Sequence, residues 1–135
     1  GEGNSAAPGL LAVEPAEVAV KADSEVGAEL GALTKGQTLK LQYSNGLWKG
    51  WGNRADINPD NTTGRGGLRC RLALAEADAE GRTTVLMLVP EGTTERPFTF
   101  TADRDIARLV LRMNDDDGNW GDNHGVVHYS ITKGR

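Results

Sequence analysis

The strongest constraint on the fold of this chain is a succession of short strand-like stretches separated by turn residues. In most of these stretches apolar and polar residues alternate, which is typical of strands that bury one face. They are too short to form stable isolated helices, so the sequence predicts a protein built mainly of β-strands. The stretches are EVAVKA (17–22), QTLKLQY (37–43), LRCRLAL (68–74), TTVLMLV (83–89), PFTFTA (97–102), ARLVLRM (107–113) and VVHYSIT (126–132).

Two other stretches, 23–30 and 73–81, can form at most a helical turn, because Gly and short length argue against full helices. Seven or eight short strands joined by turns predict an all-β fold, an antiparallel β-sandwich. The composition agrees, since 18 Gly and only 5% aromatic residues favour many turns and few helices. With 135 residues, the chain fits one small domain that can bury a core.

The first residues, GEGNSAAPG (1–9), are small or polar and contain Gly and Pro, as linkers do. We therefore divide the chain into a linker or flexible tail at 1–11 and one folded domain at 12–135. A leading linker predicts that the domain was attached to a larger protein. No signal peptide begins at residue 1, so we expect a mature chain or one excised from a longer protein.

The charge pattern argues against two classes of partner. The net charge is −4 and the Lys and Arg residues are scattered, so we expect neither a nucleic acid nor an anionic membrane as partner. The longest apolar runs, such as VLMLV at 85–89, are strand-sized and far too short to cross a bilayer.

Catalytic groups find little support, and we expect a binding module and not an enzyme. The single Cys, Cys70, excludes an internal disulfide, and alternation places it with Leu68, Leu72 and Leu74 on an apolar face. The two His residues lie far along the chain from it. No Ser–His–Asp set or phosphate-binding loop is visible, and the carboxylates crowd into one loop instead of occupying contrasting environments.

Two polar segments interrupt the strand pattern. The first, SNGLWKGWGNRADINPDNTTGRGG (44–67), is too long for a hairpin turn. The second, MNDDDGNWGDNHG (113–125), connects the last two predicted strands. Long irregular loops in compact domains are often functional, so both are predicted to contribute to a site.

The second segment carries Asp115, Asp116, Asp117 and Asp122, which repel one another unless they splay into solvent or hold a cation. Oxygen ligands on a flexible loop suit Ca²⁺ better than Mg²⁺, and Zn²⁺ would require more His or Cys. The EF-hand pattern does not fit, because a loop starting at Asp115 has neither its Gly nor its final Glu. A solvated turn remains the alternative.

NDDDGNWGDNHG (114–125) resembles the calcium loop of the PA-I galactophilic lectin family. SNGLWKGWGNRADINPD (44–60) resembles that family's first binding loop, with its Trp-Gly and Pro-Asp, and GLRC (67–70) is similar to the strand that follows. The matches lie within residues 38–135. The resemblance implies a jelly-roll-like sandwich of the galactose-binding-domain type and a Ca²⁺ cofactor.

Carried over residue by residue, the resemblance implies five Ca²⁺ ligands. Asp115, Asp122 and Asn123 would contribute side-chain oxygens, and Asn119 and Asn45 main-chain carbonyls. In that family the metal also binds two vicinal sugar hydroxyls, typically O3 and O4 of galactose. Asp115, Asp122 and Asn123 would therefore contact the sugar as well.

Five further residues are predicted to contact the sugar. The family's His, near O6 of the sugar, falls on Asn58, and an insertion, NTTGRG (61–66), brings Asn61 or Arg65 into the neighbouring space. Arg65 raises the alternative of an acidic sugar such as a uronic acid, since guanidinium pairs well with carboxylate. Trp48 and Trp120 are predicted to be exposed and to stack on the apolar face of a sugar.

Together these features predict a Ca²⁺-dependent carbohydrate-binding module or lectin that targets a larger secreted glycan-active enzyme. We expect it outside the cell, with a bacterial cell surface as one location and a parent catalytic domain in the same chain. One alternative is an accessory domain in which Ca²⁺ serves only stability. A small metal-dependent hydrolase is another, although the sequence offers no nucleophile or base for it.

Overall fold

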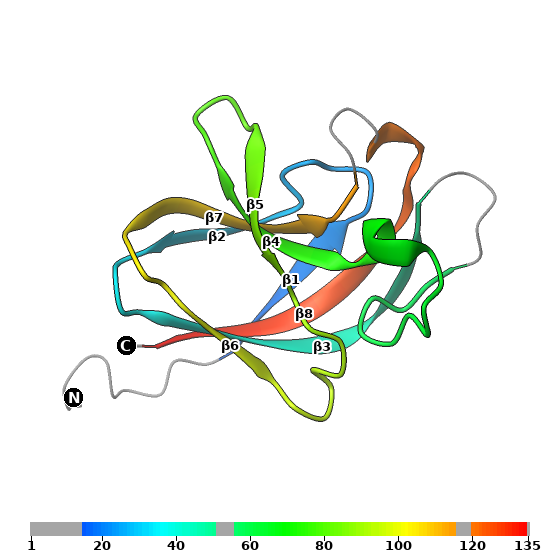
Figure 1. Cartoon of the computed structure of the whole chain (residues 1–135), viewed down its shortest axis with the longest axis horizontal. Helices are drawn as coiled ribbons and strands as arrows, with labels where there is room; N and C mark the ends of the chain where they lie inside the picture. The colour runs from blue at the N-terminus through cyan, green and yellow to red at the C-terminus, as the bar shows by residue number, and fades with distance from the viewer. Residues whose placement is uncertain (1–14, 51–55, 116–119, 135) are drawn as a thin grey trace.

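The computed structural model describes residues 15–50, 56–115 and 120–134, and they form two four-stranded antiparallel sheets that face each other (Figure 1). One sheet has the order β1-β8-β3-β6 and the other β2-β7-β4-β5. The strands are β1 (Ala16–Lys21), β2 (Ala28–Leu33), β3 (Thr38–Lys49), β4 (Leu72–Ala77), β5 (Thr83–Leu88), β6 (Phe98–Thr101), β7 (Ile106–Met113) and β8 (His124–Gly134). The predicted β-sandwich is confirmed.

The core lies between the two sheets and is built from the alternation that the sequence shows. On β3 and β8, every second residue points inward, so Leu39, Leu41, Val127 and Tyr129 are buried. Central β7 is buried along most of its length. Burial of such side chains stabilises by about 1.5–3 kcal/mol each relative to exposure, which explains why the short strands assemble.

Two stretches that were expected to form at most helical turns contain strands instead. Segment 23–30 leads into β2, and segment 73–81 contains most of β4. β4 lies between β5 and β7, and its residues Ala73 and Ala75 are fully buried. Cross-strand pairing thus overrides the weak helical preference of its Ala and Leu residues.

The stretch LRCRLAL was also predicted as one continuous strand, and this is wrong at its start. Gly67–Cys70 forms a short 3₁₀ helix, η2, ahead of β4. Leu68 is therefore 63% exposed and not on the apolar face, whereas Cys70 is buried as predicted. No helix in the described part of the chain is long and apolar enough to cross a membrane.

Candidate functional site

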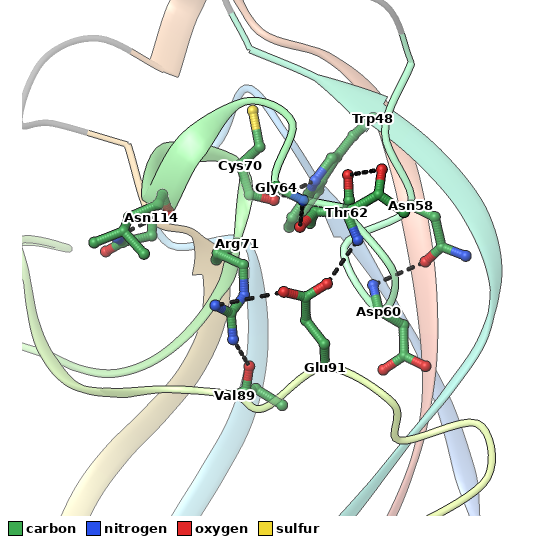
Figure 2. Close-up of polar contacts among 12 residues, drawn as sticks. Trp48, Asn58, Asp60, Thr62, Gly64, Cys70, Arg71, Val89, Glu91 and Asn114 are labelled. Carbon is green, nitrogen blue, oxygen red and sulfur yellow. Dashed lines mark hydrogen bonds and ion pairs between the residues drawn. The ribbon is translucent and has the colours of Figure 1, made fainter.

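The first polar segment is closed at its base by Trp48, which lies near the end of β3. The Trp48 amide donates to the Ile57 carbonyl (3.0 Å), and the Ile57 amide donates back to the Trp48 carbonyl (2.7 Å). The buried indole Nε1 of Trp48 donates to the Cys70 carbonyl (2.9 Å). The outgoing strand, the returning segment and η2 are thereby held together (Figure 2).

The acidic segment contacts the same 3₁₀ helix from the other side. Asn114 Nδ2 donates to the Leu68 carbonyl (3.1 Å), and the Asn114 amide donates to the Arg71 carbonyl (2.9 Å). Residues 67–71 therefore lie between the two polar segments, and both segments meet at one end of the sandwich. The sequence prediction that both contribute to one region is consistent with this arrangement.

The base of the acidic segment is fixed by a buried group around Met113. Its carbonyl accepts from Trp120 Nε1 (3.2 Å) and from Arg112 Nη1 (2.8 Å). The Arg112 guanidinium lies over the Trp120 ring, 4.8 Å from its centre, which is a cation–π contact. Arg112 Nη1 is also 3.5 Å from the Asp115 carbonyl oxygen.

Asn123 is buried beside this group, directly before β8. Its Nδ2 donates to the Ala22 carbonyl (2.9 Å) and contacts Met113 Sδ (3.3 Å). The amide oxygen is thus turned towards Gly50, where an added Cβ would come within 3.3 Å of it. A glycine at position 50 keeps the space next to this oxygen open.

The arrangement of strands is similar to that of a solved structure described as "EclA N-terminal domain; PllA-like lectin". The two share 20% sequence identity and a TM-score of 0.57, over 90% of this chain and 96% of that chain. The fold is that of a PllA-like lectin. Neither a protein-family model nor any curated protein matches the sequence, so the likeness rests on structure.

The residues at this end of the lectin fold can provide a donor set that suits a hard cation. Asp115 is half-buried, Asp122 is exposed, and Asn123 is fixed with its amide oxygen towards Gly50. Carboxylate and amide oxygens are what Ca²⁺ prefers. Within the described residues no group of three or more His, Cys, Asp or Glu comes together. Asn119 lies outside the described residues.

Asn45, the fifth expected ligand, is not brought to this end of the fold. It lies within β3 opposite His128, whereas Lys49 is the residue of β3 that pairs with His124 next to Asn123. Lys49 lies four positions further along the strand than Asn45, which is about 13 Å at 3.3 Å per residue. The expected role is wrong because β3 continues to Lys49, and the structure places Gly50 beside Asn123 instead.

The expected exposure of the two tryptophans is also wrong. Trp48 is fully buried and Trp120 is 4% exposed. Each indole N–H donates to a carbonyl, of Cys70 and of Met113 respectively, so both rings serve as internal supports for the two segments. In this structure neither presents an open face for stacking on a sugar.

The three remaining sugar-contact candidates lie on the returning part of the first segment. Asn58 is half-buried, and its Oδ1 accepts from the Asp60 amide (2.8 Å), which closes a tight turn. Asn61 and Arg65 are exposed, and Arg65 Nη2 lies 3.5 Å from the Asp56 carbonyl oxygen. All three are accessible enough to contact a ligand.

Sequence reasoning missed residues that hold the segment of these candidates in place through hydrogen bonds. Asp60 is buried and accepts hydrogen bonds from Thr93 and Thr94, which lie on the loop between β5 and β6. The Asp in the Pro59-Asp60 pair was visible in the sequence, but its partners were not, because they lie more than thirty positions away. Exposed Leu68 was missed because η2 interrupts the alternation.

Proposed function

We propose that this protein is a Ca²⁺-dependent carbohydrate-binding domain. It binds a galactose-type glycan through two vicinal hydroxyls that complete the coordination of the metal. Asp115, Asp122 and Asn123 supply side-chain oxygens to the metal, and the two carboxylates accept hydrogen bonds from the same hydroxyls.

One observation carries this proposal: the two polar segments meet at one end of a sandwich with the fold of a PllA-like lectin. Asn114 and Trp48 donate to the carbonyls of Leu68 and Cys70, so the two segments contact the same 3₁₀ helix, η2. The lectin neighbour is described as a domain of its protein, EclA. We extend this to the present chain as a binding domain of a larger secreted glycan-active protein, without catalysis of its own.

Metal coordination explains how such a site can bind a sugar. Sugar hydroxyls are well hydrated, so a hydrogen bond to protein replaces one to water and yields only about 0.5–1.5 kcal/mol net. A cation with open coordination positions adds direct ligation and strengthens the hydrogen bonds to the carboxylates around it.

The test is a glycan array probed with and without EDTA. We expect binding to galactose-terminated glycans that EDTA abolishes and added Ca²⁺ restores. Asp115→Ala should remove binding in Ca²⁺ as EDTA does, whereas Asp103→Ala, in the turn between β6 and β7, should not. Undiminished binding in EDTA would rule out the metal's role, and no binding to any glycan would rule out the lectin function.

A second candidate is an accessory domain in which Ca²⁺ stabilises the loop without binding sugar. The observation in its favour is the burial of Trp48 and Trp120, which leaves neither ring open for stacking. Thermal unfolding separates the two functions. Under the lectin proposal, galactose raises the melting temperature beyond the effect of Ca²⁺, whereas in the accessory domain only Ca²⁺ raises it.

A further inference from the structure

Asp60 is a buried carboxylate, 4% exposed, whose charge is met by an unusually complete set of donors. Its Oδ1 accepts from the amide (2.8 Å) and the hydroxyl (2.7 Å) of Thr93. Its Oδ2 accepts from the amide (2.9 Å) and the hydroxyl (2.8 Å) of Thr94. Hydrogen bonds to a charged acceptor are among the strongest in proteins, and four of them offset the cost of burying the carboxylate.

These four bonds fix the orientation of the carboxylate as well as its position. Each oxygen receives one amide and one hydroxyl, so the group cannot rotate without losing bonds. Tyr43 lies nearby, because its amide donates to Thr93 Oγ1 (2.9 Å). Burial raises the pKa of Tyr43, and the charge of Asp60 raises it further. Both Asp60 oxygens are occupied, so it is not itself a sugar or metal ligand.

The same loop between β5 and β6 attaches the first segment at two further points. The Gly92 amide donates to the Asp60 carbonyl (2.9 Å), and the Thr62 amide donates to Glu91 Oε1 (2.6 Å). Glu91 Oε2 is in turn 3.7 Å from Arg71 Nη1, and Arg71 Nη2 donates to the Val89 carbonyl (2.9 Å). Figure 2 shows the contacts that run from Thr62 through Glu91 to Arg71, and separately the hydrogen bond from the Asp60 amide to Asn58.

The candidate sugar contacts depend on these attachments. Asn58 accepts from the Asp60 amide through its side chain, and its carbonyl accepts from the Asn61 amide (3.0 Å). The Arg65 amide donates to the Thr62 carbonyl (3.0 Å). Thr63 has φ of 52°, a left-handed conformation that is costly for a β-branched residue and persists only when its surroundings enforce it.

We propose that Asp60, held by Thr93 and Thr94, is the positioning residue of the sugar-specificity segment 58–65. The inference rests on the proposed function. We call the hydrogen bonds of Asp60 to Thr93 and Thr94 the clamp. The segment that the clamp holds contacts the part of the sugar that lies away from the metal, because Asp115, Asp122 and Asn123 belong to the second polar segment. Two steps of recognition are thus separated, with the metal binding vicinal hydroxyls and the clamped segment selecting the rest of the sugar.

The first test measures the segment itself by amide hydrogen exchange, without any ligand. Asp60→Asn replaces one oxygen by an NH₂ group that faces donors, so two hydrogen bonds are lost. We expect the amides of Asn61, Thr62 and Arg65 to exchange at least about tenfold faster, while those of β7 and β8 stay protected. Unchanged protection in segment 58–65 would overturn the proposal.

A milder variant and a matched control guard against general misfolding. Thr94→Val removes only the hydroxyl that donates to Asp60 Oδ2, from an exposed residue. Thr99→Val makes the same change at an exposed position on β6. We expect Thr94→Val to speed exchange in the segment to a smaller degree than Asp60→Asn, and Thr99→Val to leave it unchanged. Equal effects from both Thr variants would contradict a specific clamp.

The second test compares affinities for Ca²⁺, D-galactose and its 6-deoxy analogue D-fucose by calorimetry. Asp60→Asn should leave the Kd for Ca²⁺ within about twofold of wild type and weaken galactose binding roughly tenfold. It should also reduce any preference between galactose and D-fucose, which a merely destabilised but folded protein would retain. Wild-type galactose affinity and preference in Asp60→Asn would overturn the proposal. Absence of sugar binding by wild type would instead refute the proposed function and leave the exchange test valid.

Discussion

Gly125 lies at the start of β8, where it pairs with Trp48 of β3. Its φ is 101°, and an added Cβ would lie 2.5 Å from the Leu47 carbonyl oxygen and 2.8 Å from Trp48 Cα. Both contacts are to backbone, which cannot move aside without disturbing the ladder next to Asn123. Gly125 is the last residue of the acidic segment, and the structure gives the steric reason for a Gly there.

We expect Gly125→Ala to destabilise the fold by more than about 2 kcal/mol, because backbone strain and a steric clash add together. Urea unfolding measures the loss. Gly36→Ala is the matched control, since Gly36 has φ of 90° but no atom within 4 Å of an added Cβ. It should lose only the strain contribution, so equal losses in the two variants would contradict the steric explanation.

Arg112 lies near the end of β7, at the base of the acidic segment. It is buried, and its guanidinium reaches the Asp115 carbonyl while stacking on Trp120. A cation this near the candidate metal site repels Ca²⁺. Like charges at contact distance near a protein surface repel by several kcal/mol. The support lost with the side chain is about 1–2 kcal/mol.

We therefore expect Arg112→Met to bind Ca²⁺ at least about tenfold more tightly than wild type, although it unfolds more easily. Arg112→Lys keeps the charge and should stay close to wild type in Ca²⁺ affinity. Calorimetric titration with Ca²⁺ is the measurement. Weaker Ca²⁺ binding by Arg112→Met would show that the support of the loop outweighs the repulsion.

At the scale of elements, alternation predicted the strands that bury one face and failed where neighbours decide. β3, β6, β7 and β8 were all recognisable because their apolar residues recur at every second position. The second half of β4 was missed because Ala75 and Ala77 are buried by packing with Val110 and Val26, which are distant in the sequence. The end of β3 was also missed, since Ser44, Asn45 and Gly46 are typical of turns but here continue the strand as far as Lys49.

The 3₁₀ helix η2 is held by two side chains. The indole of Trp48, on β3, donates to the Cys70 carbonyl, and Asn114, directly after β7, donates to the Leu68 carbonyl. Trp48→Phe keeps most of the ring but removes the donor to the Cys70 carbonyl. Leaving a buried carbonyl unsatisfied costs about 1–3 kcal/mol. We expect a loss of stability in that range by urea unfolding at fixed Ca²⁺ concentration. A change below about 0.5 kcal/mol would mean that the bond contributes nothing to holding η2.

At the scale of the whole molecule, the β-sandwich followed from the sequence, whereas the internal supports of the candidate site did not. Asp115, Asp122 and Asn123 could be named as candidate ligands because they stand within one segment of the sequence. Asp60 and its partners are far apart along the chain, and no periodicity links them. Contacts of this kind depend on tertiary packing, which a single sequence does not encode in any local pattern.

The core between the sheets also makes stability depend on pH. Burial, followed by the charge of Asp60, raises the pKa of Tyr129 well above its usual value of 10.0, and the pKa of Tyr43 is raised in the same direction. Above about pH 10 the unfolded chain loses these protons while the folded protein keeps them, so the unfolded state binds fewer protons. The free energy of unfolding therefore falls as pH rises through this window.

We expect a loss of up to about 1.4 kcal/mol per pH unit for Tyr129 alone between pH 10 and 11. Urea unfolding at pH 8, 10 and 11 measures it. Tyr129→Phe should be less dependent on pH in this range, because it removes the titrating group. The same slope in wild type and Tyr129→Phe would assign the alkaline loss to other groups.

The insertion 61–66 is attached to the loop between β5 and β6 through the Thr62 amide and the adjoining Asp60. Its length and composition can therefore vary without a change in the segment that carries Asp115, Asp122 and Asn123. A loop of this kind can diversify between relatives, or be exchanged in a library, while the rest of the domain stays constant. Asp60, Thr93 and Thr94 then form a constant attachment point, and the insertion 61–66 can be replaced by other loop sequences.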